Sequence, residues 1–159
     1  MCEIKAPSSL SSIDFTKEKT VFLAGSIEMG KAEIWQTKIA SSLKDTDWIV
    51  LNPRRDDWDS SWVQTIENKQ FREQVEWELE AQEKAQTIVM YFDPTTKSPI
   101  TLLELGLFCF KNLIVCCPEG FWRRGNVCIV CKRYGIKQVE TIEELAKEIR
   151  NCLFWSRRK

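Results

Sequence analysis

Short apolar runs alternate with longer segments of helical periodicity along most of the chain, and this order constrains the fold more than any other feature. The apolar runs predict strands over residues 20–24, 48–51, 87–92, 113–117 and 138–139. The segments between and after them predict helices over residues 31–43, 67–85, 99–110, 127–134 and 142–153. Strands that alternate with helices build a parallel sheet covered on both faces. We therefore predict an α/β, flavodoxin- or Rossmann-like three-layer domain with a parallel sheet of about five strands.

The length of 159 residues suits one domain with a proper core. We expect a single domain over residues 18–155, between a loose, polar N-terminal tail (1–17) and a short C-terminal tail (156–159). The longest mostly apolar stretch, 100–110, is interrupted by Glu104 and is too short to cross a bilayer. The seven cysteines are an odd number and fall mostly in apolar patterns, which is typical of reduced thiols. These features predict a cytoplasmic protein without a membrane partner.

Composition excludes several kinds of chemistry. The chain has no histidine, so Ser-His-Asp hydrolysis, Cys-His proteolysis and histidine-ligated zinc are excluded. Cys128 and Cys131 form a C-x-x-C pair without a suitable second pair, and no dinucleotide or Walker fingerprint is present, so we expect no metal and no cofactor. The 23 basic residues equal the 23 acidic ones, so we expect no duplex nucleic acid as a partner. Any proton chemistry then falls mainly to carboxylates.

Glu104 is the one acidic residue in the helix predicted after Ser98 and Pro99, which fit its N-cap and first position. Its neighbours are apolar or small all round, so we expect this helix to be buried. A buried carboxylate costs several kcal/mol unless it is paired or hydrogen-bonded. Two interpretations are open, a nucleophile kept ionised near the start of the helix and a structural glutamate satisfied by backbone or arginine.

Glu78 is the second carboxylate in an unexpected place. It falls inside the apolar arc of the helix predicted over 67–85, whereas the other acids of that helix fall on the opposite face. Cleavage of a glycosidic bond uses one carboxylate against the anomeric carbon and often a second to manage protons or orient the sugar. Ion pairs with Arg54, Arg55 or Arg72 would explain the same burial without any catalysis.

Binding residues are sought where the predicted strands end, because ligands of such sheets bind beyond the carboxyl ends of the strands. Gly25 and Ser26 form a turn there that could approach a phosphate or a sugar closely. The loop over 52–62 carries Arg54, Arg55 and Trp58, which could hold a phosphate and stack on a base. A solvated loop that folds its tryptophans onto the core is the alternative.

Five segments in this order resemble the nucleoside 2-deoxyribosyltransferase-like superfamily: FLAGSIEMGKAEIWQ, LNPRRDDWDSSW, FREQVEWELEAQEKAQTIVMYF, SPITLLELGLF and PEGFWRRGNVCIVCKRYGI. The resemblance implies that Glu104 is a nucleophile forming a covalent glycosyl-enzyme, that Glu78 helps to hold the sugar, and that Asp93 assists proton transfer. It also implies a phosphate-binding turn at Gly25 and Ser26, as in the 2′-deoxynucleoside 5′-phosphate N-hydrolases. Asn126 matches an amide given to the sugar site of a neighbouring subunit, which implies a homo-oligomer. Cys128 departs from the pattern, since close relatives often carry an acid after GNV.

The resemblance therefore predicts cleavage or transfer at the N-glycosidic bond of a (2′-deoxy)nucleoside or nucleotide, and leaves transferase and hydrolase activity both open. The predicted catalytic residues are Glu104, Glu78 and Asp93. The predicted substrate-binding residues are Gly25, Ser26, Arg54, Arg55, Trp58, Ser98 and Asn126. The alternative is a non-catalytic nucleotide or nucleotide-sugar sensor on the same fold.

Overall fold

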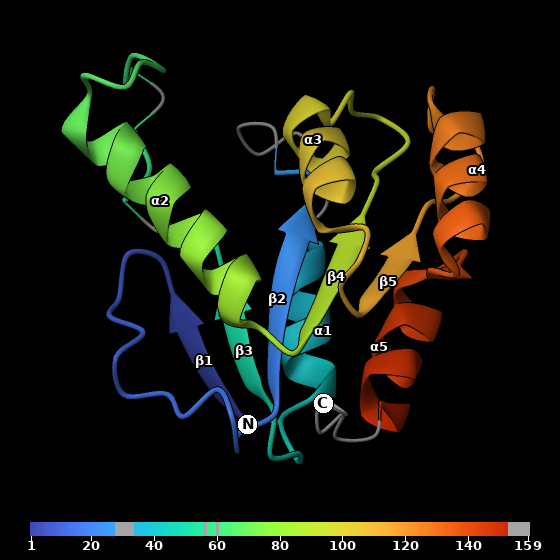
Figure 1. Cartoon of the computed structure of the whole chain (residues 1–159), viewed down its shortest axis with the longest axis horizontal. Helices are drawn as coiled ribbons and strands as arrows, with labels where there is room; N and C mark the ends of the chain where they lie inside the picture. Colours follow the sequence, from blue (N-terminus) through green and yellow to red (C-terminus); the bar gives the residue numbers. More distant parts are fainter. Residues whose placement is uncertain (28–33, 56, 60, 153–159) are drawn as a thin grey trace.

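Six parallel strands form the central sheet of the computed structural model, which describes residues 1–27, 34–55, 57–59 and 61–152 (Figure 1). The sheet order is β1-β3-β2-β4-β5-β6, and every neighbouring pair is parallel. The strands are β1 (Cys2–Lys5), β2 (Thr20–Gly25), β3 (Ile49–Asn52), β4 (Thr87–Tyr91), β5 (Leu113–Cys116) and β6 (Lys137–Val139). The predicted α/β three-layer class is confirmed, with six strands in place of about five.

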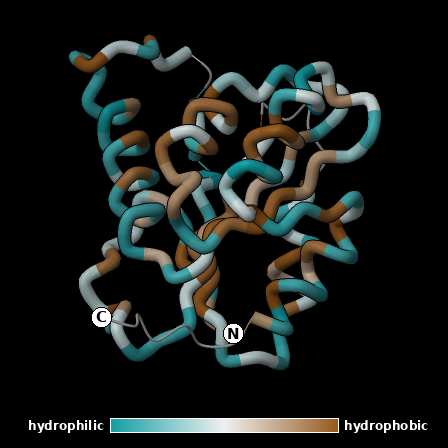
Figure 2. The backbone as a smooth tube through the Cα atoms, turned by 45° about the vertical axis from the view of Figure 1, so that its right-hand side comes forward, coloured by the Kyte–Doolittle hydropathy of each residue, from teal (hydrophilic) through white to brown (hydrophobic). Residues whose placement is uncertain are grey.

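Within the described ranges, five helices cover the two faces of the sheet: α1 (Trp35–Ser42), α2 (Lys69–Lys84), α3 (Pro99–Phe108), α4 (Arg124–Tyr134) and α5 (Ile142–Asn151). Alternate residues of each central strand belong to two separate cores, as the pleat of a strand requires. In β2, Phe22 and Ala24 pack with α2, α3 and α4, whereas Val21 and Leu23 pack with α1 and α5. The apolar positions gather accordingly in the middle of the molecule (Figure 2). No helix in the described part of the chain is long and apolar enough to span a membrane.

The N-terminal segment is not the loose tail that the sequence predicted. Residues Cys2–Lys5 add an edge strand beside β3, with Cys2 opposite Ile49 and Lys5 opposite Asn52. Leu10 is buried in the core, and the Trp77 indole N–H donates a hydrogen bond to the carbonyl of Ser8 at 2.8 Å. The strand is short and carries charged residues at alternate positions, so its pattern resembles a polar tail. The predicted C-terminal tail, 156–159, and the predicted start of the helix over 31–43 lie outside the described residues.

The N-termini of α5 and α3 are capped differently. Thr141 caps α5, because its hydroxyl accepts a hydrogen bond from the amide of Glu144 at 3.1 Å. Ser98 stands at the N-cap of α3, but its hydroxyl makes no capping hydrogen bond and its φ is +46°. That side chain is directed to other hydroxyl groups instead.

The expectation that α3 is buried on all sides is wrong. Thr101, Glu104, Leu105 and Phe108 face the protein interior. The opposite side is exposed although it is apolar, at Ile100, Leu103 and Leu107. Composition alone therefore overstated the burial of the helix, but it placed Glu104 correctly on the buried side, where it is 8% exposed.

Gly25 has a structural requirement of its own. Its φ is +150°, and a Cβ there would lie 2.6 Å from the carbonyl oxygen of Tyr91 and 2.9 Å from the ring of Trp35. Both neighbours are held in the sheet and the core, so they cannot move aside cheaply.

We expect Gly25→Ala to lower the free energy of unfolding by about 2–4 kcal/mol, from overpacking together with backbone strain. Urea denaturation measures this change. Gly106→Ala is the matched control, since nothing lies within 4 Å of a Cβ at that helical position. The control should stabilise the protein by roughly 0.5–1 kcal/mol through helix propensity. Equal effects of the two substitutions would show that the close approach at Gly25 is not a constraint.

Candidate active site

The strand order reverses between β2 and β4, and the candidate site begins at that point. From β2 the sheet continues to β3 and β1 on one side, and to β4, β5 and β6 on the other. The crevice at such a reversal, beyond the carboxyl ends of the strands, is where open α/β sheets bind ligands. Here Ser26 follows β2, Asp93 follows β4 closely, and α3 starts above the same edge of the sheet (Figure 1).

Three buried hydroxyl groups tie these segments together. The Ser26 hydroxyl contacts that of Ser98, the Thr96 hydroxyl lies 2.9 Å from that of Ser26 and 2.7 Å from that of Ser98, and all three residues are at most 4% exposed. The amide of Asp93 donates to the Ser26 hydroxyl at 3.0 Å. The cluster lies at the positive end of α3, where an anionic group would be favoured. Sequence reasoning identified Ser26 and Ser98 but missed Thr96, for which the hydroxyl-rich run just after β4 was the available signal.

Asp93 is buried and lies in the loop between β4 and α3. Its carboxylate accepts hydrogen bonds from the amide and the hydroxyl of Thr95, at 2.8 and 2.7 Å. These contacts hold the loop between β4 and α3 in shape, as an aspartate commonly does at a turn. Its predicted part in proton transfer stays a prediction.

Glu104 lies on the buried side of α3, about a turn and a half after Ser98 at its N-cap. The side-chain amide of Gln82, from the last turns of α2, donates a hydrogen bond to Glu104 Oε1 at 2.7 Å. Burial of the carboxyl and the nearby charge of Glu78 raise the pKa of Glu104 from 4.5 to about 8, against the lowering effect of the Gln82 hydrogen bond. The group is therefore neutral over part of the physiological pH range in the unliganded protein.

Glu78, one helical turn before Gln82 in α2, also accepts a hydrogen bond from a glutamine side chain. The amide of Gln74 donates to Glu78 Oε1 at 2.7 Å, and desolvation of the carboxyl raises the pKa of Glu78 to about 7. Within the described part of the chain, neither Glu78 nor Glu104 forms an ion pair with an arginine or a lysine. The structural interpretation by arginine pairing therefore does not account for these two carboxylates. Their partners are two glutamines that the sequence analysis did not single out.

The arginines of the loop after β3 have different surroundings. Arg55 donates two hydrogen bonds to Asp57, both at 2.9 Å, and its guanidinium lies 5.0 Å from the ring centroid of Trp62. Trp58 packs edge-on against Trp62 with centroids 5.1 Å apart and remains 36% exposed. Arg55 therefore forms an internal ion pair with Asp57. Arg54 is half-buried, and its Nη1 has no hydrogen-bond partner among the described residues.

Asn126 is exposed in the first turn of α4. Among the described residues, no hydrogen bond or ion pair joins it to either of the two carboxylates. The chain on its own therefore assembles the hydroxyl cluster and the carboxylate pair, while Asn126 faces solvent.

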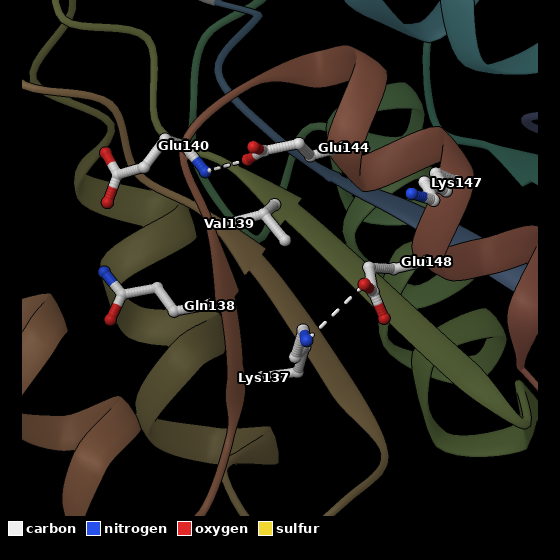
Figure 3. Close-up of a pocket in the computed structure, with 7 residues that line it drawn as sticks. All are labelled: Lys137, Gln138, Val139, Glu140, Glu144, Lys147 and Glu148. Atoms are coloured by element: carbon white, nitrogen blue, oxygen red, sulfur yellow. Dashed lines mark hydrogen bonds and ion pairs between the residues drawn. The ribbon is translucent and has the colours of Figure 1, made fainter.

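A surface hollow lies elsewhere, between β6 and α5 (Figure 3). Its volume is about 310 Å³, and Lys137, Glu140, Glu144, Lys147 and Glu148 supply its charges. Internal contacts already engage most of them, including a 3.4 Å ion pair between Lys137 and Glu148 and a 2.9 Å hydrogen bond from the Glu140 amide to Glu144. The hollow contains none of the candidate residues, and we assign it no function. Among residues 1–27, 34–55, 57–59 and 61–152, no group of three or more cysteine or acidic side chains is placed to hold a metal ion.

A family model described as "Nucleoside 2-deoxyribosyltransferase like" matches residues 18–121, which include every candidate residue except Asn126. A search of curated proteins found no match.

Proposed function

The chain belongs to the nucleoside 2-deoxyribosyltransferase-like family, and we propose that it cleaves or transfers at the N-glycosidic bond of a (2′-deoxy)nucleoside or nucleotide. The observation that carries the proposal is the buried pair Glu104 and Glu78 beside the strand-order reversal, each held by a glutamine amide and neither neutralised by a cation in the described chain. Two buried carboxyl groups with raised pKa values in one place are typical of a functional site.

The proposed reaction is retaining and has two steps. The Glu104 carboxylate adds to C1′ while the bond from C1′ to the base nitrogen breaks, and the departing base takes up a proton. Water or a second base then attacks C1′ from the opposite side, the bond to Glu104 breaks, and the attacking group loses its proton. Glu78 stays beside the sugar, where its raised pKa lets it hold a proton or orient a hydroxyl group.

Incubation with a panel of deoxynucleosides and their 5′-monophosphates, with and without an acceptor base, tests this function. Chromatography scores released and exchanged base. Release without acceptor identifies a hydrolase, and exchange identifies a transferase. If no substrate reacts while calorimetry detects nucleotide binding, the protein is a sensor, and the proposed reaction is wrong.

The residues proposed to bind the substrate lie at the same edge of the sheet, beyond the carboxyl ends of the strands. The N-terminus of α3 with its hydroxyl cluster favours an anionic 5′-phosphate, and so does the half-buried Arg54, whose Nη1 has no hydrogen-bond partner among the described residues. Exposed Trp58 offers a ring for the base. Exposed Asn126 supports the proposal of a homo-oligomer in which one subunit completes the site of another. The family supports the assignment of Glu104 and Glu78, and so does the absence of an arginine partner for either glutamate in the described part of the chain.

We expect Arg54→Met to reduce the preference for a 5′-monophosphate over its nucleoside by about tenfold to a hundredfold, the value of one charge-assisted hydrogen bond. Arg55→Met is the matched control. Because Arg55 already binds Asp57 and stacks near Trp62, its replacement should lower the melting temperature and leave the preference nearly unchanged. Michaelis constants for both substrates, measured in wild type and both variants, decide between these effects. Equal constants for the two substrates in the wild type would exclude a phosphate site.

A further inference from the structure

Gln82 is a fully buried residue of α2 whose amide group has two fixed hydrogen bonds. One N–H of its amide group is directed to Glu104 Oε1 at 2.7 Å, and the other to the backbone carbonyl of Glu78 at 3.3 Å. The backbone contact is local to α2 and anchors the amide plane. The same plane then presents its second N–H to the carboxylate on the neighbouring helix.

The arrangement is repeated two turns earlier in the same helix. The amide of Gln74 donates to the carbonyl of Pro53 and to Glu78 Oε1, at 2.8 and 2.7 Å. In both glutamines the amide oxygen is buried and has no hydrogen-bond partner in the part of the chain that the structure describes. An unsatisfied buried acceptor costs stability, so each amide group is poorly explained as a purely stabilising feature. What both groups have in common is an N–H donor aimed at a carboxylate.

We propose that Gln82 is a positioning residue that holds Glu104 in one orientation and stabilises its negatively charged form. The proposal rests on the nucleophilic role proposed for Glu104. A hydrogen bond donated to a carboxylate favours the anion, and it opposes both the burial of Glu104 and the repulsion by Glu78. Without this donor, the carboxylate would ionise at higher pH and would be free to rotate.

Few other charges act on Glu104. Glu78 is the one charged group that contributes to its raised pKa, and no other ionisable residue lies within α3 itself. The strands beneath, β2 and β4, carry no charged residue. Lys111 donates to the carbonyls of Gln82 and Glu83 at the end of α2. Gln82 is therefore the principal group on the described elements that lowers the pKa of Glu104.

The test compares Gln82→Met with Gln36→Met. Methionine keeps the length of the side chain but removes the donor. Gln36 is also fully buried, and both of its amide atoms lack partners among the described residues, so the control makes the same change away from Glu104. The full-length proteins are titrated by ¹³C NMR of labelled glutamate carboxyl groups, with the Glu104 signal assigned from Glu104→Gln. Rates of base release are measured from pH 5 to pH 10.

For Gln82→Met we expect the pKa of Glu104 to rise by about one unit, so that the acid limb of kcat/KM shifts to higher pH and activity near pH 7 falls about tenfold. The loss should shrink toward pH 10, where Glu104 ionises in both proteins. Stability should stay near that of wild type, because the variant also loses an unsatisfied oxygen. Gln36→Met should leave the pH profile and the Glu104 titration unchanged.

A wild-type titration of Glu104 in Gln82→Met would overturn the proposal, as would a fall in stability with an unshifted pH profile. Gln82→Asn provides a second variant if methionine does not fold, since its amide is one methylene too short for the 2.7 Å contact, and the same shift is expected. Failure of the underlying function is recognised separately. In that case Glu104→Gln retains activity, while the NMR titration still reports whether Gln82 affects the carboxyl.

Discussion

Glu104→Gln should lower the rate of base release or exchange by roughly a thousandfold or more, because the amide cannot form the glycosyl intermediate. The substitution keeps the shape of a side chain that is only 8% exposed, so the fold should be retained. Single-turnover rates with the best substrate of the panel measure the effect. Trapping of a sugar on the wild-type protein, found by mass spectrometry of the peptide containing Glu104, provides direct evidence for the covalent step.

Glu83→Gln is the control for the loss of one negative charge, since Glu83 is exposed near the end of α2. It should react at the wild-type rate. Glu78→Gln should retain more activity than Glu104→Gln, because Glu78 is proposed to orient the sugar or manage a proton. A folded Glu104→Gln that works at the wild-type rate would rule out Glu104 as the nucleophile.

The same substitution should make the protein more stable above neutral pH. The pKa of Glu104 is raised to about 8 in the folded state, so the folded protein holds a proton that the unfolded chain, near 4.5, has released. The stabilisation from this group is complete below about pH 4.5 and is lost as the pH rises through about 8. Glutamine does not ionise, so the variant does not suffer this loss.

We compare the free energy of unfolding of Glu104→Gln with that of wild type at two pH values. The difference in favour of the variant should be larger at pH 9 than at pH 4.5 by about 2–5 kcal/mol, at about 1.4 kcal/mol per pKa unit. Urea denaturation of both proteins at several pH values gives this difference. Titrating groups that do not interact with Glu104 are common to both proteins and cancel, whereas the difference contains the coupling between Glu104 and Glu78. Parallel stability curves would show that Glu104 ionises normally in the folded protein. Greater stability with lost activity is the pattern expected of a functional carboxylate.

The central part of the fold could be read from the sequence because its strands are buried on both faces and are therefore continuously apolar, as in β2 and β4. The edge strand β1 could not be read in this way. Cys2–Lys5 buries little and alternates polar residues, so no local pattern separates it from a solvated tail. Its pairing with β3 depends on a partner strand that is more than forty residues away in the sequence.

The candidate site shows the same division. Glu104 and Glu78 stand out because a carboxylate conflicts with the apolar pattern around it. Gln74 and Gln82 do not stand out, since a glutamine is ordinary in a helix and only the structure shows that each amide meets a carboxylate. Arg55 was predicted to bind substrate from its place after a strand, and only the structure shows its two hydrogen bonds to Asp57.

Helix α3 connects the hydroxyl cluster of the candidate site to the Glu104 carboxylate. Ser98 precedes the first residue of α3 and Glu104 is its sixth, so the helical rise sets their separation at about 9 Å along the axis. A single inserted residue between them would shift Glu104 by about 1.5 Å and turn it by about 100°, away from Gln82. The number of residues between Ser98 and Glu104 therefore fixes both the distance between them and the direction of the Glu104 side chain. Over evolutionary time this segment should accept exchanges on its exposed side, at Ile100 or Leu103, far more readily than any change in its number of residues.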